Sequence, residues 1–425
     1  MLAQLFLKEC KQTARSLIYW LIVLVLIFDF TTQLGGMDIK KKPEAGEESY
    51  GTKQSRDPEM IMKSTLGQLV EEYWRENYTT YPIGFYKNVT LNEADDQKIR
   101  EILKETTGIT DRDAAEQAVD AWYAAHEEEK GLNPSETETV KPAEPFKAEP
   151  LEGLTYDRFK ELMEEADRIL GGGSNYSKEY REKNAVVPMT YEDALKEYEA
   201  LIGEDGLTGG YARLFSDYMV IFLGILPVFL AVTRGLRDRR SMMQELIYTR
   251  RCPAFTIMAG RYLAMVAMLT IPVLLLSLVP FSKCMDYART AGIAVDMLAF
   301  VKYVFGWLVP TIMAVTAVGM LFTELTDTAV AVLIQGAWWF TAVFGGIGSL
   351  HGGSYGWSLV PRHNTPMNWQ GFHDGFAQLL ANRLLYAGAG LILMVLTALI
   401  YTQKRKGRLK IRGKISAYRK NKSEV

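Results

Sequence analysis

Hydrophobic positions along the chain gather into long apolar runs that alternate with polar stretches. Such runs predict membrane spans, because a helix needs about 20 consecutive apolar residues to cross the hydrocarbon core of a bilayer. Six spans are expected: residues 17–36, about 214–232 with a kink at Pro227, then 262–282, 303–323, 328–350 and 384–403. The predicted fold class is therefore an all-α polytopic membrane protein with six transmembrane helices.

Residues 37–210, between the first two predicted spans, have the period of amphipathic helices. Four apolar stripes carry this pattern: Met62, Leu66, Leu69, Val70 and Tyr73; Ile99, Ile102 and Leu103; Ala115, Val119, Trp122 and Tyr123; and Phe159, Leu162, Met163, Ala166, Ile169 and Leu170. Helix starts are indicated by Asn92 with Asp95, Thr110 with Asp113 and Thr190 with Asp193, each a capping residue followed by an acid in the first turn. We therefore expect a mainly helical polar domain.

Two segments of this domain depart from the helical pattern. Residues 127–153 are acidic, contain proline and have almost no aliphatic side chains, so they cannot bury enough apolar surface to offset the cost of ordering. This segment is predicted to be a mobile acidic loop. Residues 80–86 form an aromatic turn that is either part of the core or a ligand contact.

Charge is distributed unevenly between the polar domain and the rest of the chain. Residues 37–210 carry a net charge of −17 and the remainder a net charge of +15. Seven arginines lie between residues 234 and 261, and residues 404–425 contain ten Lys or Arg against one acid. Because basic residues concentrate on the cytoplasmic side of membranes, this loop and both termini are expected in the cytoplasm and residues 37–210 outside it.

The two ends of the chain fit the same topology. Residues 1–16 place Leu2, Leu5 and Phe6 on one side, which predicts an interfacial amphipathic helix on the cytoplasmic surface. The first span is expected to stay uncleaved, because residues 31–36 lack a small-x-small cleavage pattern. The basic tail is predicted to contact anionic membrane lipid, and no nucleic-acid partner is expected.

The loop after the second span combines a basic cluster, Arg239-Arg240-Ser241, with Glu245-Leu246 and a short tail into the next span. Met242, Leu246 and Thr249 recur there at helical spacing. This arrangement resembles the first cytoplasmic loop of type-2 permeases of ATP-binding-cassette transporters, and the resemblance covers residues 1–32 and 214–412. It implies a coupling helix at about 238–252 that docks into an ATPase subunit. The coupling residues so predicted are Arg239, Arg240, Met242, Glu245, Leu246 and Thr249.

The resemblance also implies a function and a set of partners. The chain is expected to be the membrane-spanning subunit of a bacterial exporter in the cell membrane, one that moves an amphipathic peptide, antibiotic or lipid outward. The partners would be a dimer of cassette ATPase subunits, which would bind ATP and Mg, and a second copy or a sister of the permease. The alternative is an ATPase-coupled sensor that uses the outer domain without translocating a substrate; a scaffold with no ATPase partner is a further possibility.

Candidate chemistry within the chain itself is sparse. No arrangement of nucleophile and base is visible, no GxxxxGK[ST] pattern occurs, and Cys10, Cys252 and Cys284 lie far apart, so neither catalysis nor a cofactor is predicted here. Residues 351–383 include His363, His373 and Asp374, whose spacing matches no metal-ligand pattern. This region is expected to form a pair of short re-entrant helices on the outer side.

Two acids fall within predicted spans. Asp29 lies in the first span, and Asp217 lies near the outer end of the second. A carboxylate in the hydrocarbon is costly unless it faces the bundle interior or water, so both are candidates for a functional role. The alternative for Asp29 is that it simply reaches the membrane interface.

Overall fold

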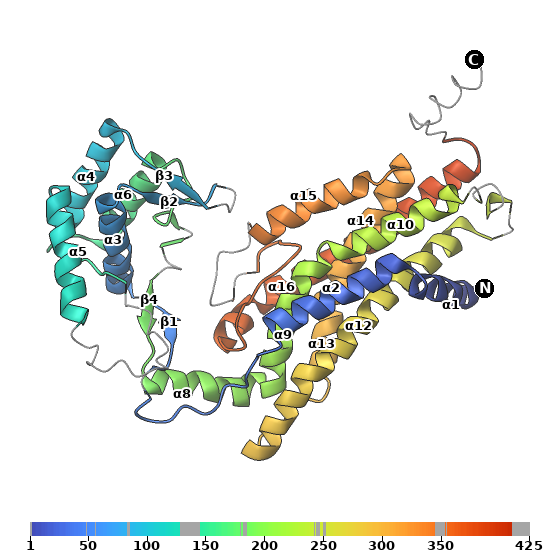
Figure 1. The fold of residues 1–425 in the computed structure, drawn as a ribbon, viewed down its shortest axis with the longest axis horizontal. Coiled ribbons are helices and arrows are strands. Elements are labelled where there is room, and N and C mark those ends of the chain that lie inside the picture. Colours follow the sequence, from blue (N-terminus) through green and yellow to red (C-terminus); the bar gives the residue numbers. More distant parts are fainter. Residues whose placement is uncertain are drawn as a thin grey trace. The chain divides into compact units, whose positions relative to one another are not determined.

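The computed structural model describes residues 2–47, 49–55, 57–82, 86–127, 145–178, 180–181, 185–241, 243, 247–249, 252–344, 353 and 355–409. The chain divides into two compact units: the helical bundle, Met1–Pro43 with Leu195–Val425, and the inserted unit, Glu44–Ala194 (Figure 1). The bundle contains α1 (Leu2–Ala14), α2 (Leu17–Gln33), η2 (Leu201–Asp205), α9 (Leu207–Leu223), α10 (Leu226–Arg240), α12 (Ala254–Ala291), α13 (Ala299–Tyr303), η3 (Val304–Leu308), α14 (Val309–Thr326), α15 (Val330–Phe344) and α16 (Trp369–Arg405).

Three helical segments of the described chain are long and apolar enough to cross a membrane: α12, the run Ala299–Thr326 and α16. Two bent pairs raise this to five if each is one span. One pair is α1 with α2, bent by 70°, and the other is α9 with α10, bent by 42°. The short apolar α15 has 15 residues. The described bundle is therefore a helical assembly with three to five candidate spanning helices, compatible with an all-α membrane protein, and the expected six spans stay a prediction.

Several helices extend beyond the apolar runs that predicted them. α12 continues to Ala291, so Lys283, Asp286 and Arg289, which lie beyond the predicted span 262–282, are on its last turns. α16 begins at Trp369, so the pair of short helices expected within residues 351–383 is wrong for residues 369–383. Hydropathy marks only the stretch that lipid can cover, whereas a helix continues as long as its backbone hydrogen bonds are maintained.

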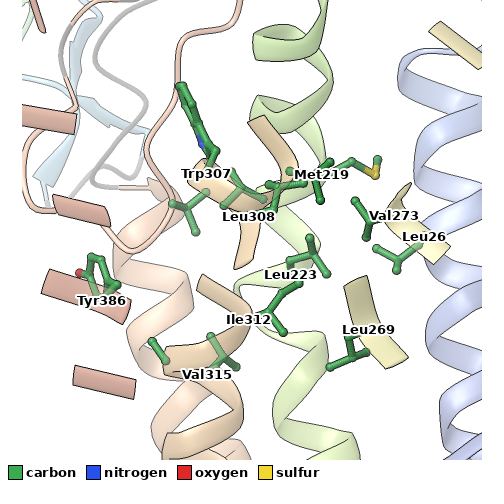
Figure 2. Packing of buried hydrophobic residues seen from close by; sticks show 14 of the residues in the cluster. Leu26, Met219, Leu223, Leu269, Val273, Trp307, Leu308, Ile312, Val315 and Tyr386 are labelled. Carbon is green, nitrogen blue, oxygen red and sulfur yellow. The ribbon is translucent and has the colours of Figure 1, made fainter. Parts of the chain in front are cut away.

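The bundle core is formed by apolar side chains from α2, α9, α12, α14 and α16, with Trp307 of η3. Figure 2 shows Leu26, Met219, Leu269, Val273, Ile312 and Val315 meeting at this core, and each is almost completely buried. Small residues let neighbouring helices approach: a Cβ at Gly319 of α14 would overlap with Ala231 of α10. Helices inside membranes commonly pack through such small residues.

The inserted unit has its own helical core and two short sheets. Its elements are β1 (Thr52–Gln54), α3 (Pro58–Trp74), β2 (Tyr78–Thr80), β3 (Lys87–Val89), α4 (Glu93–Thr107), α5 (Arg112–Glu127), α6 (Tyr156–Ile169), β4 (Val186–Pro188) and the start of α8 (Tyr191–Ala200). β1 pairs with β4 and β2 with β3, both antiparallel. The four predicted stripes pack into this core, although Trp122, Tyr123 and Ile169 are only partly buried.

Two of the three predicted helix caps are confirmed. The side chain of Asn92 accepts from the Asp95 backbone N–H at 3.0 Å, and Thr190 accepts from the Asp193 N–H at 3.2 Å. The cap predicted at Thr110 is wrong, because Asp111 instead accepts from the Ala114 N–H at 2.9 Å. Residues 128–144 of the predicted acidic loop lie outside the described residues.

A buried carboxylate, Glu72 of α3, joins separate segments of the inserted unit. Its side chain accepts hydrogen bonds from the Tyr176 hydroxyl, from Gln68 Nε2 at 3.2 Å and from Asn175 Nδ2 at 3.4 Å. These donors are all neutral. Burial raises the pKa of Glu72 to about 7, although the hydrogen bonds act in the opposite direction.

Candidate functional site

The segment between α10 and α12 contains the residues predicted to couple the chain to an ATPase. Arg239 forms an ion pair with Asp327 at the end of α14, with Nη1 2.6 Å from Oδ2. Arg240 and Thr249 are exposed. Met242, Glu245 and Leu246 lie outside the described residues, so the predicted coupling helix is described only in part.

The last turn of α16 holds the described part of this loop. Arg405 Nε donates to the Tyr248 carbonyl at 2.8 Å, and Nη1 donates to the Cys252 carbonyl at 2.6 Å. The Tyr248 ring also packs edge-on against Tyr401, with ring centroids 5.4 Å apart. The loop is thereby attached to α16 through Arg405, which lies 157 residues after Tyr248 in the chain.

Beside the loop, a cluster of buried ion pairs connects α1, α10 and α12. Arg234 donates to both carboxylate oxygens of Glu9, at 2.6 and 2.7 Å, and Arg261 approaches the same carboxylate at 3.5 Å. Asp238 pairs with Arg234 at 3.2 Å and with Arg261. Glu9 is only 4% exposed. Arg234 precedes the loop and Arg261 follows it, so one carboxylate from α1 contacts both helices that bound the loop.

A second set of ion pairs continues from this cluster to α14 and α16. Lys404 Nζ lies 2.8 Å from Asp327 Oδ1 and 3.3 Å from Glu324 Oε1, and Asp327 also binds Arg239. Together the two sets have four acids and four bases, so their formal charges cancel. The eight residues, here called the ion network, are Glu9, Arg234, Asp238, Arg239, Arg261, Glu324, Asp327 and Lys404.

A small cavity of about 20 Å³ opens within the ion network. It is lined by Gly235, Asp238, Arg239, Ile247, Arg261, Glu324, Asp327 and Tyr401. A volume of this size has room for about one water molecule. The cavity is therefore too small for a transported molecule.

At the other end of the bundle, buried charges bind the connection between α15 and α16. Asp217 of α9, fully buried, accepts from Arg362 Nε at 2.9 Å and from the His363 backbone N–H. Arg213, also buried, donates to Asp205 at 2.6 Å and to the Pro366 carbonyl at 2.9 Å. The connection is thus held against α9 by charged hydrogen bonds.

A further buried charge, Arg383 of α16, binds the same connection at Ser358. Its guanidinium donates to the carbonyls of Trp307 and Ser358 at 3.0 and 3.2 Å and to the Thr311 hydroxyl at 2.9 Å. Carbonyl and hydroxyl acceptors thus satisfy this buried charge.

The histidines of this region occupy separate environments. His363 is buried, its Nδ1 2.8 Å from the Tyr355 hydroxyl and its Nε2 3.1 Å from the Met367 carbonyl. Burial, together with the nearby Arg213, lowers the pKa of His363 to about 3, so the ring stays neutral. His373 is exposed beside Asp374. His363 therefore acts as a hydrogen-bonding residue of the core.

The two acids predicted within the membrane are both buried. Asp217 is paired as described above, whereas Oδ2 of Asp29 has no hydrogen-bond partner among the described residues. Asp29 is 4% exposed, so its carboxyl group is enclosed by the bundle, and both its functional role and the alternative that it reaches the interface stay predictions.

Sequence reasoning missed Glu9, which the structure places at the centre of the ion network. A signal was present, because Leu2, Leu5, Phe6 and Glu9 recur at helical spacing and so share one face of α1. An acid on the apolar face of a helix requires a buried cation as its partner. Comparison with family models, with curated proteins and with solved structures finds no match for this chain.

Proposed function

We propose that this chain is the membrane subunit of an ATP-driven exporter and that the loop between α10 and α12 docks on a separate ATPase. The observation that carries the proposal is the attachment of this arginine-rich loop to α16 through Arg405 and Tyr401. A force applied to the loop would act directly on α16. The ion network would distribute the same force to α1, α10, α12 and α14.

α16 is suited to transmit such a movement. Its 37 residues correspond to a length of about 55 Å at 1.5 Å per residue. One end binds the loop through Arg405, and Arg383 within the same helix binds the connection between α15 and α16. Displacement of the loop would thus reach the far half of the bundle.

In this proposal ATP and Mg bind to the ATPase dimer, and the cargo is an amphipathic peptide, antibiotic or lipid. The apolar residues exposed on α12 and α16, such as Leu275, Leu278, Leu384 and Ile392, face lipid or a second permease. Residues 37–210 lie outside the cell, and both termini lie in the cytoplasm of a bacterium.

A second candidate function is signalling, favoured by the inserted unit. Glu44–Ala194 is compact and has its own core, as expected of a domain that could bind a ligand. ATPase movements would then alter the inserted unit without passing a substrate. Cargo loss from inside-loaded liposomes, coupled to ATP hydrolysis, would separate export from signalling.

The docking step is tested with Arg405→Ala and the matched control Arg408→Ala. Arg408 is exposed and lies three residues after Arg405. In complexes purified from native membranes in mild detergent, Arg405→Ala should retain the ATPase but uncouple hydrolysis from export at least tenfold. Recovery of no ATPase with the wild-type chain would refute the proposal.

The orientation is tested by labelling Met243→Cys in a chain whose own three cysteines are replaced. Met243 is 47% exposed, so the new thiol is reachable. In intact cells it should react only with membrane-permeant reagents. Reaction with an impermeant reagent from outside would invert the topology and remove the docking site from the ATPase.

A further inference from the structure

Asp29 is a buried carboxyl group that the docking mechanism does not use. It is the single charged residue of α2, it is 4% exposed, and its Oδ2 has no hydrogen-bond partner in the described part of the chain. An isolated ionised carboxylate in apolar surroundings is strongly unfavourable, so such a group either pairs with a cation or takes up a proton.

The helices packed against α2 are α1, α9, α10 and α12. Their charged side chains are Lys8, Glu9 and Lys11 on α1; Arg213 and Asp217 on α9; Arg234, Arg237, Asp238, Arg239 and Arg240 on α10; and Arg261, Lys283, Asp286 and Arg289 on α12. The titratable neutral groups of these elements and of α2 are Cys10, Tyr19, Tyr211, Tyr218, Tyr262, Cys284 and Tyr287. Arg362 adds one further cation from the connection between α15 and α16.

The buried cations of these elements are engaged elsewhere. Arg213 binds Asp205, and Arg234 and Arg261 belong to the ion network. Lys283 donates to the carbonyls of Gly35 and Met37, at 3.1 and 2.9 Å. The remaining charges on α1, α10 and α12 outside the ion network, among them Lys8, Lys11 and Asp286, lie at exposed positions.

Arg362 is the cation whose field reaches Asp29, and it already serves another acid. Its Nε lies 2.9 Å from Asp217 Oδ2, and its Nη2 lies 3.3 Å from Asn364 Oδ1. Asp217 thus occupies the Arg362 guanidinium, so ionisation of both buried carboxyl groups would leave one negative charge uncompensated. Among the described residues no group of three acids, histidines or cysteines could hold a metal ion.

We propose that Asp29 is a proton-binding site of the bundle, loaded with a proton in this conformation, and that its deprotonation competes with Asp217 for Arg362. In the step itself the O–H bond of Asp29 breaks and the proton passes to water when movement of α2 admits it. The resulting carboxylate attracts Arg362 away from Asp217. The segment from Arg362 to Met367, anchored through that pair, then loosens. This proposal does not depend on export or on an ATPase.

The proton is detected by infrared spectroscopy of the purified chain in detergent at pH 7, without nucleotide. The wild type should show a carbonyl stretch of a protonated carboxyl group that disappears in Asp29→Asn and persists in Asp286→Asn, a matched control at an exposed acid of α12. Asp29→Glu should restore a shifted band. Identical spectra of the wild type and Asp29→Asn would overturn the proposal. Loss of the band on addition of sodium or potassium ions would also overturn it, because an alkali cation would then be the ligand of Asp29.

The competition for Arg362 is detected by hydrogen exchange of the backbone from Arg362 to Met367, corrected for the intrinsic effect of pH. In the wild type, protection should fall at least tenfold as pH rises through the range in which the infrared band disappears. Asp29→Asn, permanently neutral, should keep its protection over the same range. Equal loss of protection in both proteins would show that Asp29 does not control this segment.

Discussion

Substitution of Glu72 by Gln should remove the loss of stability that this carboxyl group causes in the inserted unit as pH rises. Burial raises the pKa of this carboxyl from its usual 4.5 to about 7, since its side-chain donors are neutral and no cation among the described residues compensates its charge. One pKa unit corresponds to about 1.4 kcal/mol, so the rise represents about 3 kcal/mol. The folded state binds the proton more tightly than the unfolded state does. The stabilisation is therefore fully present below pH 4.5 and is lost as pH rises to about 7.

Native-state hydrogen exchange of α3 in the full-length chain measures this effect. Between about pH 4 and pH 8, the free energy of unfolding of Glu72→Gln should rise by about 3 kcal/mol relative to that of the wild type. The matched control is Glu101→Gln, which removes an exposed acid of α4 and should leave the slope unchanged. A wild-type unit whose stability rises over this range, or a variant with the same slope as the wild type, would refute the reasoning.

Three further substitutions test separate contacts. Glu9→Gln leaves Arg234 and Arg261 without their shared carboxylate and should destabilise the bundle by about 3–5 kcal/mol. Thermal unfolding in detergent measures this loss, and Lys8→Gln, at an exposed position of the same helix, should have no effect. Gly67→Ala places a methyl group against the Phe146 carbonyl and should destabilise the inserted unit by about 1–3 kcal/mol in a hydrogen-exchange measurement; an unchanged stability would contradict this close packing. Arg383→Met removes the donor to the Ser358 carbonyl and should speed hydrogen exchange of residues 355–360, and unchanged exchange would show that other contacts hold this segment.

The helices of the chain were largely predictable, because apolar runs and apolar stripes are patterns of residues that lie near one another in the sequence. Apolar runs located the central turns of α12 and α16, and the stripe from Met62 to Tyr73 located α3. The ends of the membrane helices were not predictable in this way. Lys283 and Asp286 continue α12 into polar surroundings, where hydropathy carries no information about the backbone.

The candidate site was predictable only in part, since its residues are brought together from distant parts of the chain. The arginine-rich loop is visible in the sequence, but its attachment to Arg405 joins segments about 150 residues apart. Likewise Asp217 could be recognised as a buried acid, whereas its partner Arg362 lies in a connection without periodicity. Pairing of this kind depends on packing, which a single sequence does not encode locally.

The pairing of β1 with β4 has a consequence for how such a chain could diversify. Thr52 lies opposite Pro188, so the polypeptide comes into the inserted unit and leaves it along neighbouring strands. A folded module whose two ends are adjacent can be excised or exchanged for another without stretching the host. Grafting a short hairpin in its place would therefore yield a bundle without the inserted unit. The same bundle could also acquire a different inserted domain in a single recombination event.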